Sequence, residues 1–359
     1  MSFRPFKQVP RILFGKNVTS RIKELIPDDI LETEGYFVVV IDSALDSSKY
    51  SRLLDNIVFI EYDANKSEPH TSDVNEIVSK LKSKGSKVKA IIGIGGGSTM
   101  DVAKSVSVLL NNEGAAEDFQ GWDLVKRPGV FKIGVPTISG SGSEASRTAV
   151  LSSAIKKQGI NSDYSMFDAV ILDWENTISV PFETGFYTAM DTYIHCVESI
   201  DGTMINSLSR TYASEALKIC ESLFAVNYRE NFSSDLYREK IMLASYFGGV
   251  SIVNSEVGIC HALSYGLSME LGLRHGYANC LVFAVLDEYY CSYVNDFREV
   301  LRINNIILPS GITLDLDNAA FERMVEMTLR MERPLENALG KNWREKLTRE
   351  KIIELYQKI

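Results

Sequence analysis

The chain has 359 residues, a length that favours two domains over one. Hydrophobic residues make up 45% of it and charged residues 24%, the mixture expected of a globular protein with a full-sized core. Its formal net charge of -9 argues against a nucleic-acid binder and against docking on an anionic membrane, because both need a basic face.

The sequence gives no indication of a membrane span, a signal peptide or a disulfide framework. No uncharged apolar run approaches the roughly 18 residues of a membrane span, and the N-terminus lacks the apolar core of a signal peptide. The 5 cysteines, an odd number without CxxC spacing, indicate reduced thiols rather than a disulfide framework. We therefore expect a cytoplasmic protein, and a homodimer as the commonest symmetric assembly.

The first half of the chain reads as strands alternating with helices. The alternation predicts a mostly parallel sheet with helices on both faces, in an α/β domain of residues 1–180. Continuous apolar runs predict strands at 36–41, 56–62, 88–94 and 132–136, and the stretches between them predict helices at 71–84 and 99–110.

The second half loses this alternation, and its apolar residues recur at helical spacing. We expect an all-helical domain over residues 181–359, with the boundary inside 179–183 and a surface connection at 304–317. The predicted helices cover 182–200, 207–226, 234–250, 277–290, 321–331 and 343–359.

A glycine-rich loop joins the third predicted strand to a predicted helix. Gly95, Gly96 and Gly97 remove side chains where the backbone turns, and they let N–H groups approach an anion. We expect Ser98 to cap the helix, whose N-terminus favours a pyrophosphate, with Asp101 on the following turn. The loop matches neither the G-x-G-x-x-G fingerprint nor a Walker A loop, so a turn that binds nothing is an equal alternative.

A second loop of small residues, 136–144, also follows a predicted strand. Two such loops at the carboxyl ends of strands suit a nucleotide in the crevice of an open α/β sheet. Asp42 ends the first predicted strand, where a carboxylate can bond a ribose 2′-hydroxyl and repel a 2′-phosphate. That interpretation favours NAD over NADP, and the alternative is a turn-forming aspartate.

Three of the 4 histidines lie in the helical half. Asp191 and His195 are four residues apart, which places them on one face of a helix. With His261 and His275 they supply one carboxylate and three imidazoles, a set that suits one Fe(II) or Zn(II) ion. Each histidine alone is more often a packing residue. A metal beside a nicotinamide indicates alcohol oxidation, in which the metal polarises the substrate oxygen and the carbon gives hydride to the cofactor.

Four stretches in a fixed order, 95–104, 136–144, 191–198 and 261–276, carry a family resemblance. The sequence resembles the iron-containing (group III) alcohol dehydrogenases over essentially its whole length. The resemblance implies a Rossmann-like N-terminal domain, an all-helical C-terminal domain and an active site in the cleft between them. It implies a metal bound by the four residues Asp191, His195, His261 and His275.

The resemblance also implies where NAD would be held. It places Gly96, Gly97 and Ser98 at the pyrophosphate and Asp42 near the adenosine ribose. The remaining cofactor contacts that it implies are Thr137, Ser139, Ser141, Ser146 and Lys157.

Three residues bear on the chemistry of the substrate. Tyr265 stands where the family commonly has a second histidine credited with proton relay, so Tyr265 is expected to relay protons or to shape the pocket. Arg147 and Arg274 suggest a carboxylated or phosphorylated substrate, with structural or solvated arginines as the alternative. The likeness predicts a primary alcohol on an acidic sugar, as in the 3-deoxy-manno-octulosonate 8-oxidase type.

Other functions remain open from the sequence alone. A simple alcohol, diol or glycerol dehydrogenase shares the fold, although glycerol dehydrogenases typically bind zinc through one Asp and two His. A dehydroquinate-synthase-like lyase shares it too, typically with Glu and two His as ligands. A nucleotide-binding protein without turnover is the alternative from another class.

Overall fold

The computed structural model describes residues 5–64, 68–153, 157–226 and 228–359. The chain forms two compact units, and the division between them falls at Val180 and Pro181. Phe6 belongs with the second unit, because its ring stacks on Tyr212 with 5.7 Å between ring centroids.

A six-stranded sheet forms the centre of the first unit. Its strand order is β1-β9-β6-β4-β2-β3, and every pair in it is parallel. The mostly parallel sheet predicted from the alternation is therefore confirmed. Its strands are β1 (Ile12–Phe14), β2 (Tyr36–Asp42), β3 (Ile57–Tyr62), β4 (Val88–Gly95), β6 (Lys132–Pro136) and β9 (Ala169–Leu172).

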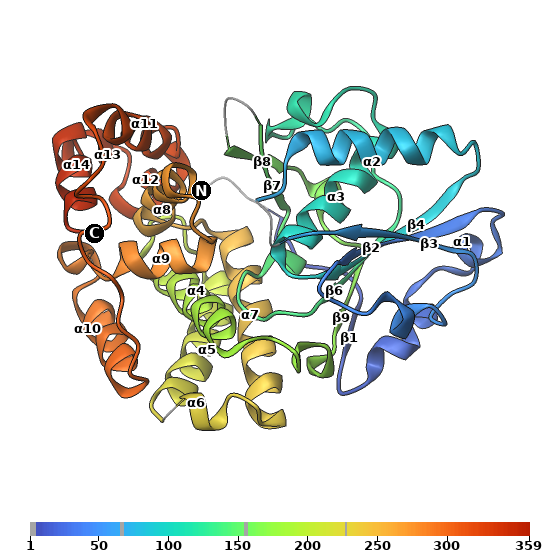
Figure 1. The fold of residues 1–359 in the computed structure, drawn as a ribbon, viewed down its shortest axis with the longest axis horizontal. Coiled ribbons are helices and arrows are strands. Elements are labelled where there is room, and N and C mark those ends of the chain that lie inside the picture. The colour runs from blue at the N-terminus through green and yellow to red at the C-terminus, as the bar shows by residue number, and fades with distance from the viewer. Residues whose placement is uncertain (1–4, 65–67, 154–156, 227) are drawn as a thin grey trace. The chain divides into compact units, whose positions relative to one another are not determined.

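Helical segments cover both faces of this sheet (Figure 1). Phe37 and Val39 of β2 pack with Ile22 and Leu25, which lie in the 3-10 helix η1 (Val18–Leu25) before β2. The helices of the other face pack on each other and on the central strands. Burial on both faces explains why the central strands are apolar throughout rather than alternating. The helices of this unit are α1 (Asp28–Glu32), α2 (Thr71–Ser83) and α3 (Gly97–Asn111).

A second, three-stranded sheet of order β5-β8-β7 was not anticipated from the sequence. Strands β7 and β8 pair antiparallel, and β5 pairs parallel with β8. Strand β5 precedes the second small-residue loop in the chain, and β7 and β8 follow it. Its strands are β5 (Gly121–Trp122), β7 (Thr148–Ser152) and β8 (Lys157–Asn161).

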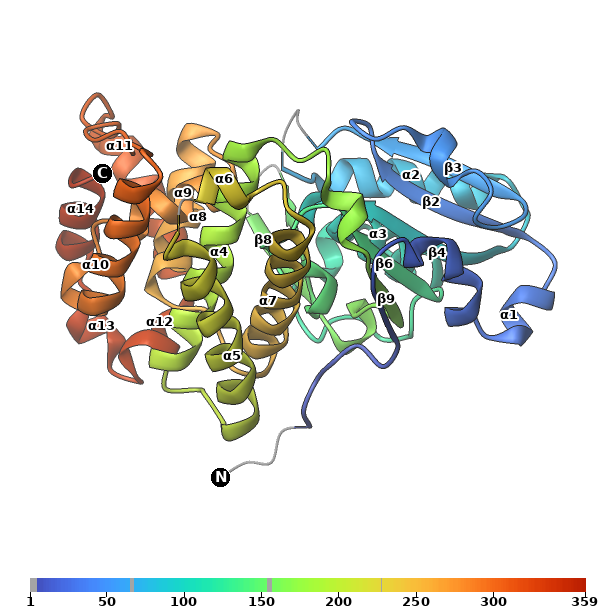
Figure 2. The ribbon, with the colours of Figure 1, turned by 90° about the horizontal axis from the view of Figure 1, so that it is seen from below.

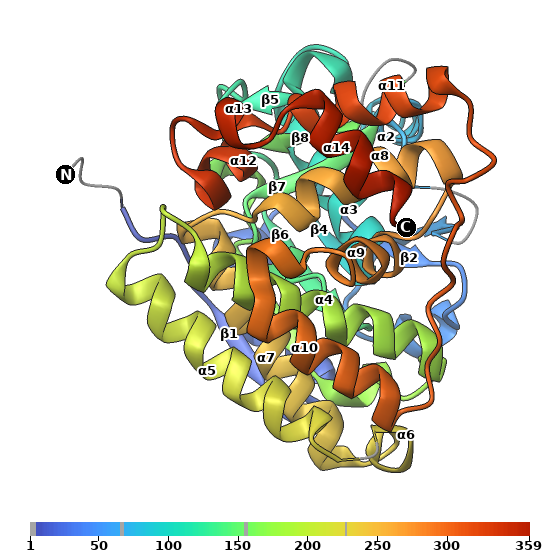
Figure 3. The ribbon, with the colours of Figure 1, turned by 90° about the vertical axis from the view of Figure 1, so that its left-hand side faces the viewer.

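All the regular secondary structure in the described residues of the second unit is helical. Helices α4, α5 and α7 pack against one another (Figure 2), and α11 to α14 gather at the top of the view in Figure 3. No helix of the described chain is both long and apolar enough to span a bilayer. The helices are α4 (Phe182–Asp201), α5 (Ser207–Phe224), α6 (Tyr228–Asn231), α7 (Asp235–Asn254), α8 (Ile259–Leu271), α9 (His275–Phe283), α10 (Asp287–Ile303), α11 (Asn318–Leu329), α12 (Glu332–Leu339), α13 (Trp343–Lys346) and α14 (Arg349–Gln357).

Two of the predicted helices are wrong as single helices. The helix predicted at 277–290 ends at Phe283, and a new helix begins at Asp287. The Arg298 guanidinium donates to the carbonyl of Ala284 at 2.7 Å and pairs with the Asp287 carboxylate, which connects the end of α9 to the start of α10. Leu286 is fully buried there, so the apolar spacing runs on through the interruption.

The helix predicted at 343–359 is likewise divided in two. Helix α13 ends at Lys346, and Thr348 then caps α14 by accepting the Lys351 backbone N–H at 3.3 Å. A threonine cap of this kind starts a helix by satisfying one of its free N–H groups. The connection expected at 304–317 is irregular apart from turns.

The close packing of α3 on β4 yields a test of the first unit. A Cβ on Gly93 would lie 2.8 Å from the Ala103 Cβ, so Gly93→Ala should destabilise the protein by about 1–3 kcal/mol through overpacking. Urea unfolding followed by tryptophan fluorescence measures this, because Trp122 and Trp174 lie in this unit.

The matched control is Gly248→Ala within α7. There the new Cβ would meet its nearest atoms at 3.5 Å, an ordinary contact, and alanine favours a helix over glycine. We expect Gly248→Ala to keep or raise the unfolding free energy. Equal losses in the two variants would contradict the packing argument.

Candidate metal centre and cofactor loops

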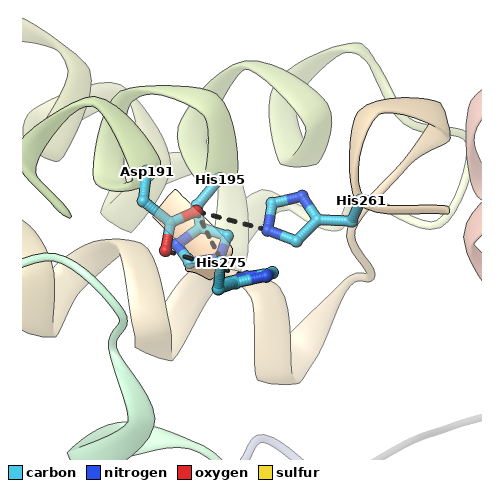
Figure 4. Close-up of side chains that lie close together, drawn as sticks. All are labelled: Asp191, His195, His261 and His275. Atoms are coloured by element: carbon cyan, nitrogen blue, oxygen red, sulfur yellow. Dashed lines mark ion pairs between the residues drawn. The ribbon is translucent and has the colours of Figure 1, made fainter. Parts of the chain in front are cut away.

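Helix α4 supplies two polar side chains to the interior of the second unit (Figure 4). Asp191 and His195 lie one turn apart on one face of α4, as the sequence predicts, and only 2% and 3% of them is exposed. Isolated charges are rarely buried without a partner. The depth of Asp191 therefore requires positive or hydrogen-bonding groups around it.

Two further helices bring histidines to the same place. His261 lies in the first turn of α8, and His275 opens α9. A Cβ on Gly276 would lie 2.8 Å from the Tyr187 backbone oxygen, so only glycine lets the first turn of α9 pack directly on α4. This close approach sets His275 beside the α4 residues.

The four side chains converge on one point (Figure 4). Asp191 Oδ1 lies 3.7 Å from His195 Nε2 and 3.4 Å from His261 Nε2, and Asp191 Oδ2 lies 3.9 Å from His275 Nε2. All four ligand atoms lie within 4.8 Å of one another. Ligands about 2.0–2.2 Å from a tetrahedral metal stand roughly 3.3–3.6 Å apart, so the set needs only a small contraction to bind an ion.

The electrostatics of the cluster favour a cation. Burial alone would raise the pKa of Asp191, but the three histidines outweigh burial and hold that pKa well below its usual range. Burial lowers the pKa of His195 to about 4, despite the nearby Asp191. Burial also acts to lower the pKa of His261, yet Glu198 and Asp191 raise it to about 10. The raised pKa of His261 reflects the negative charge of Glu198 and Asp191, which a divalent cation would also balance.

One residue of the cluster was missed in the sequence. Asn279, one turn after His275 on α9, places its amide Nδ2 2.6 Å from Asp191 Oδ1 and 3.2 Å from Nε2 of both His261 and His275. The side-chain amide of Asn279 therefore helps to orient the Asp191 carboxylate. The spacing of four from His275 was the available signal, although asparagine is too common for that spacing to stand out.

The donor set fits one divalent transition metal. Three imidazoles and one carboxylate suit Fe(II) or Zn(II), whereas Mg²⁺ and Ca²⁺ prefer more oxygen ligands. The His195 Nδ1 atom is buried and has no hydrogen-bond partner among the described residues, so no hydrogen bond at that atom competes with a metal for the orientation of the ring. The His275 side chain is 30% exposed, so the cluster is accessible on that side.

The glycines of the first loop allow two close approaches in the first unit. A Cβ on Gly95 would lie 2.5 Å from Thr99 Oγ1, and one on Gly97 would lie 3.1 Å from Ser141 Oγ. The Thr137 backbone N–H donates to the Gly95 carbonyl at 3.0 Å, which joins the two small-residue loops at the carboxyl ends of β4 and β6. The two small-residue loops are therefore in direct contact with each other.

The prediction that Ser98 caps the following helix is wrong. Helix α3 begins at Gly97, and Gly96 occupies the N-cap position without a side chain to donate or accept. The first-turn N–H groups are therefore not capped by that side chain and can receive an anion. Nearby on the second loop, the Ser139 hydroxyl is buried without a partner among the described residues.

A buried lysine holds the second loop against α3. The Lys104 ammonium is fully buried and donates to Ser143 Oγ at 2.9 Å, Ser146 Oγ at 3.0 Å and the Thr148 carbonyl at 2.8 Å. Burial lowers the pKa of Lys104, and its negative neighbours only partly offset this. Ser146, expected to contact the cofactor, is thus engaged within the loop.

Asp101 completes this network. Its carboxylate accepts the Ser143 hydroxyl at 2.7 Å and the Val150 backbone N–H at 3.0 Å, and it lies 3.5 Å from the Lys104 ammonium. Burial raises the pKa of Asp101, and Lys104 and the hydrogen bonds counteract that rise. Asp101, predicted at the cofactor, here joins α3 to the second loop.

Comparison with known proteins identifies the family. Residues 10–174 match the model of the iron-containing alcohol dehydrogenases, and residues 186–358 match the C-terminal domain model of the same family. The chain belongs to the iron-containing alcohol dehydrogenase family. The parallel α/β unit and the helical unit are the two parts that these models describe.

The curated relatives of the chain match it over only part of its length. The chain is 34% identical to the sulfoacetaldehyde reductase of Bilophila wadsworthia over 225 residues, which are 61% of this chain and 57% of that protein. It spans between 52% and 63% of the length of the first curated relatives that it matches.

Solved structures match over almost the whole chain. An iron-containing alcohol dehydrogenase from Thermotoga maritima matches with a TM-score of 0.80, 25% identity and coverage of 99% of this chain and 98% of that one. A sulfoacetaldehyde reductase from Bifidobacterium kashiwanohense, solved with NAD+, matches with a TM-score of 0.81 and 20% identity over 99% and 98%. These likenesses support the iron-containing alcohol dehydrogenase fold.

The remaining candidates for cofactor binding in this member of the family have local partners. Asp42 ends β2, and its Oδ1 accepts the Ala44 backbone N–H at 3.0 Å, which makes a turn and leaves Oδ2 for a further contact. Lys157 on β8 is buried and pairs with Glu68 at 3.1 Å. Both residues therefore carry structural contacts whether or not a cofactor binds.

The candidates for substrate contacts differ from one another. Arg147 in the first unit pairs with Asp123 and with Asp163 at 2.9 Å, which supports the structural alternative for this arginine. Arg274 is exposed at the N-cap of α9, next to His275. The Tyr265 ring lies edge-on to the His275 ring, with centroids 5.7 Å apart at 77°. Tyr265 thus borders the metal cluster, and Arg274 adjoins the cluster in the sequence.

The Lys104 network gives a test of how the loops are held. Lys104→Met leaves Asp101 buried without its cation, which should cost about 3–5 kcal/mol of unfolding free energy. Adding Asp101→Asn removes the stranded charge, so the double variant should recover part of the loss. Urea unfolding of the single and double variants measures both effects. Additive losses would contradict direct coupling between Lys104 and Asp101.

Proposed function

We propose that this chain is an NAD-dependent and metal-dependent alcohol oxidoreductase. The observation that carries the proposal is the convergence of one carboxylate and three imidazoles on a single point in the helical unit. Family membership favours Fe(II) as the resident ion over Zn(II). An alcohol oxidoreductase also needs a place for the hydride acceptor, which the two small-residue loops of the first unit would supply.

The residues of the first unit would hold NAD by its phosphates. The open N-terminus of α3, formed by Gly96, Gly97 and Ser98, offers backbone N–H groups and the positive end of the helix dipole to a pyrophosphate. The Ser139 hydroxyl, buried and without a partner in the described part of the chain, would gain one, and Thr137 and Ser141 lie two residues to either side of it in the sequence. Asp42 would bond a ribose hydroxyl and disfavour NADP.

The residues of the second unit would hold the metal and orient its ligands. When bound, the metal supplies a Lewis acid that polarises the substrate oxygen. Asp191 contributes the one negative charge, and Asn279 fixes that carboxylate by donating to Oδ1. The buried faces of His195 and His261 exclude water. The partly exposed His275 marks the side from which a substrate would approach.

For the substrate, we favour a primary alcohol or aldehyde that carries an anionic group. Arg274, exposed beside His275, offers a guanidinium to such a group. Similarity to sulfoacetaldehyde reductases supports a small anionic substrate, and the sequence prediction of an acidic sugar such as 3-deoxy-manno-octulosonate belongs to the same charge class. Tyr265 would then shape the pocket wall next to His275.

The test is NADH formation by chelator-stripped protein reloaded separately with Fe(II) and Zn(II). The panel holds simple alcohols, diols, glycerol, sulfonated alcohols and sugar acids, each with NAD and with NADP. We expect metal-dependent NADH formation, greatest with an anionic primary alcohol. We also expect Arg274→Ala to raise KM for the anionic substrate at least tenfold, and KM for a neutral alcohol by less than twofold.

Other outcomes would overturn particular parts of the proposal. NADH formation with neutral alcohols alone would exclude the anionic substrate while leaving the oxidoreductase intact. Turnover by the stripped protein equal to that of the loaded protein would exclude a catalytic metal. NAD binding without net reduction on any substrate would favour a lyase of the same fold or a protein without turnover.

A further inference from the structure

A third polar residue of α4 lies behind the metal cluster. Glu198 follows Asp191 by seven residues and His195 by three, so all three share one face of the helix. The side chain is buried, with 1% of Glu198 exposed. A carboxylate at this depth needs strong hydrogen-bond donors. It obtains them from the helix that carries His261.

One oxygen of Glu198 contacts the imidazole ring of His261. Glu198 Oε2 lies 2.5 Å from His261 Nδ1, while Nε2 of the same ring faces Asp191 Oδ1 at 3.4 Å. A carboxylate at Nδ1 favours the tautomer in which that nitrogen carries the proton. The Nε2 lone pair is then directed toward the cluster. A carboxylate behind a ligand in this way fixes the ring and raises its basicity.

The other oxygen of Glu198 fixes the backbone that carries this histidine. Oε1 accepts the Cys260 N–H at 2.7 Å and the His261 N–H at 3.4 Å, in the first turn of α8. A Cβ on Gly258 would lie 2.6 Å from the Tyr290 hydroxyl and 3.0 Å from Oε1, so glycine makes room for both Tyr290 and the carboxylate at this helix end. One side chain therefore sets both the position of α8 and the orientation of its histidine.

Of the two histidines on α4 and α8, only His261 has a carboxylate at its Nδ1 atom among the described residues. The rings of His195 and His261 stack with centroids 4.6 Å apart, but His195 Nδ1 has no hydrogen-bond partner in the described part of the chain. No hydrogen bond at Nδ1 among the described residues therefore fixes the orientation of the His195 ring. The His261 ring cannot turn without breaking its contact with Glu198.

We propose that Glu198 is a positioning residue for the metal centre, which holds His261 as the Nδ1–H tautomer with Nε2 directed at the ion. This inference rests on the proposed metal centre and adds a role for a residue outside the ligand set. Loss of the Glu198 charge should weaken metal binding even though all four ligands remain.

The first experiment compares Co(II) binding to stripped wild-type protein and to Glu198→Gln, by competition with a chromophoric chelator and by the visible Co(II) spectrum. We expect Glu198→Gln to weaken Co(II) binding about 10–100-fold and to shift its absorption bands. The control is Asn206→Ala, which removes the side chain that caps α5 by accepting the Leu208 and Ser209 N–H groups at 3.1 and 3.0 Å. We expect that variant to keep the wild-type affinity and spectrum, although it loses a helix cap.

The outcomes separate the inference from the metal centre itself. Wild-type affinity and an unchanged spectrum in Glu198→Gln would reduce Glu198 to a helix cap and overturn the inference. Failure of the wild-type protein to bind Co(II) would overturn the metal centre, and the inference with it.

A second measurement does not depend on a variant that folds. Long-range ¹H–¹⁵N spectra of zinc-loaded protein with ¹⁵N-labelled histidine report the tautomer of each ring. We expect His261 to keep a slowly exchanging proton on Nδ1 and to bind zinc through Nε2. Coordination through Nδ1, or a rapidly exchanging Nδ1 proton, would contradict the proposal.

Discussion

The buried charge of Asp191 is the constraint around which the helical unit is arranged. A carboxylate removed from water costs several kcal/mol unless it is paired and hydrogen-bonded. The chain surrounds it with His195 from its own helix, His261 from α8 and His275 from α9, and Asn279 donates to it directly. The three histidines that make this burial tolerable form, together with Asp191 itself, a ligand set for one divalent cation.

The surrounding helices are placed by small residues and by Glu198. Gly276 lets α9 pack on the backbone of α4, and Gly258 makes room for the Glu198 carboxylate at the start of α8. Glu198 then holds both the first turn of α8 and the His261 ring. A site whose ligands come from three helices needs such fixed points, because small errors in helix position move the ligand atoms out of range.

The first unit also contains a buried charge that its neighbours stabilise, but here the buried charge is a cation. Lys104 is fully buried, and its three donors bind Ser143, Ser146 and the Thr148 carbonyl, while Asp101 balances its charge. This network fixes the second small-residue loop against α3, where the glycines bring the two loops together. The groups that remain available to bind an anion are the backbone N–H groups at the start of α3. Because they belong to the backbone, substitution of a surface side chain would not remove them.

Much of this could be predicted from the sequence, and the misses have physical reasons. Long apolar runs in the sequence predict strands β2 and β4. Strands β1 and β9 have only three and four residues, too few to show a repeating pattern of apolar residues. The break before Asp287 is hidden because Leu286 stays buried through it. The three candidate histidines stood out because histidine is rare in this chain, but Glu198 and Asn279 are common residue types whose contacts are visible only in three dimensions.

The most direct test of a metal centre built on Asp191 is calorimetric titration of the stripped protein with Fe(II) under anaerobic conditions. The account predicts one ion per chain, a rise in melting temperature on loading, and loss of both effects in Asp191→Ala. Absence of binding by the wild-type protein, or binding of the same strength and stoichiometry by Asp191→Ala, would contradict it.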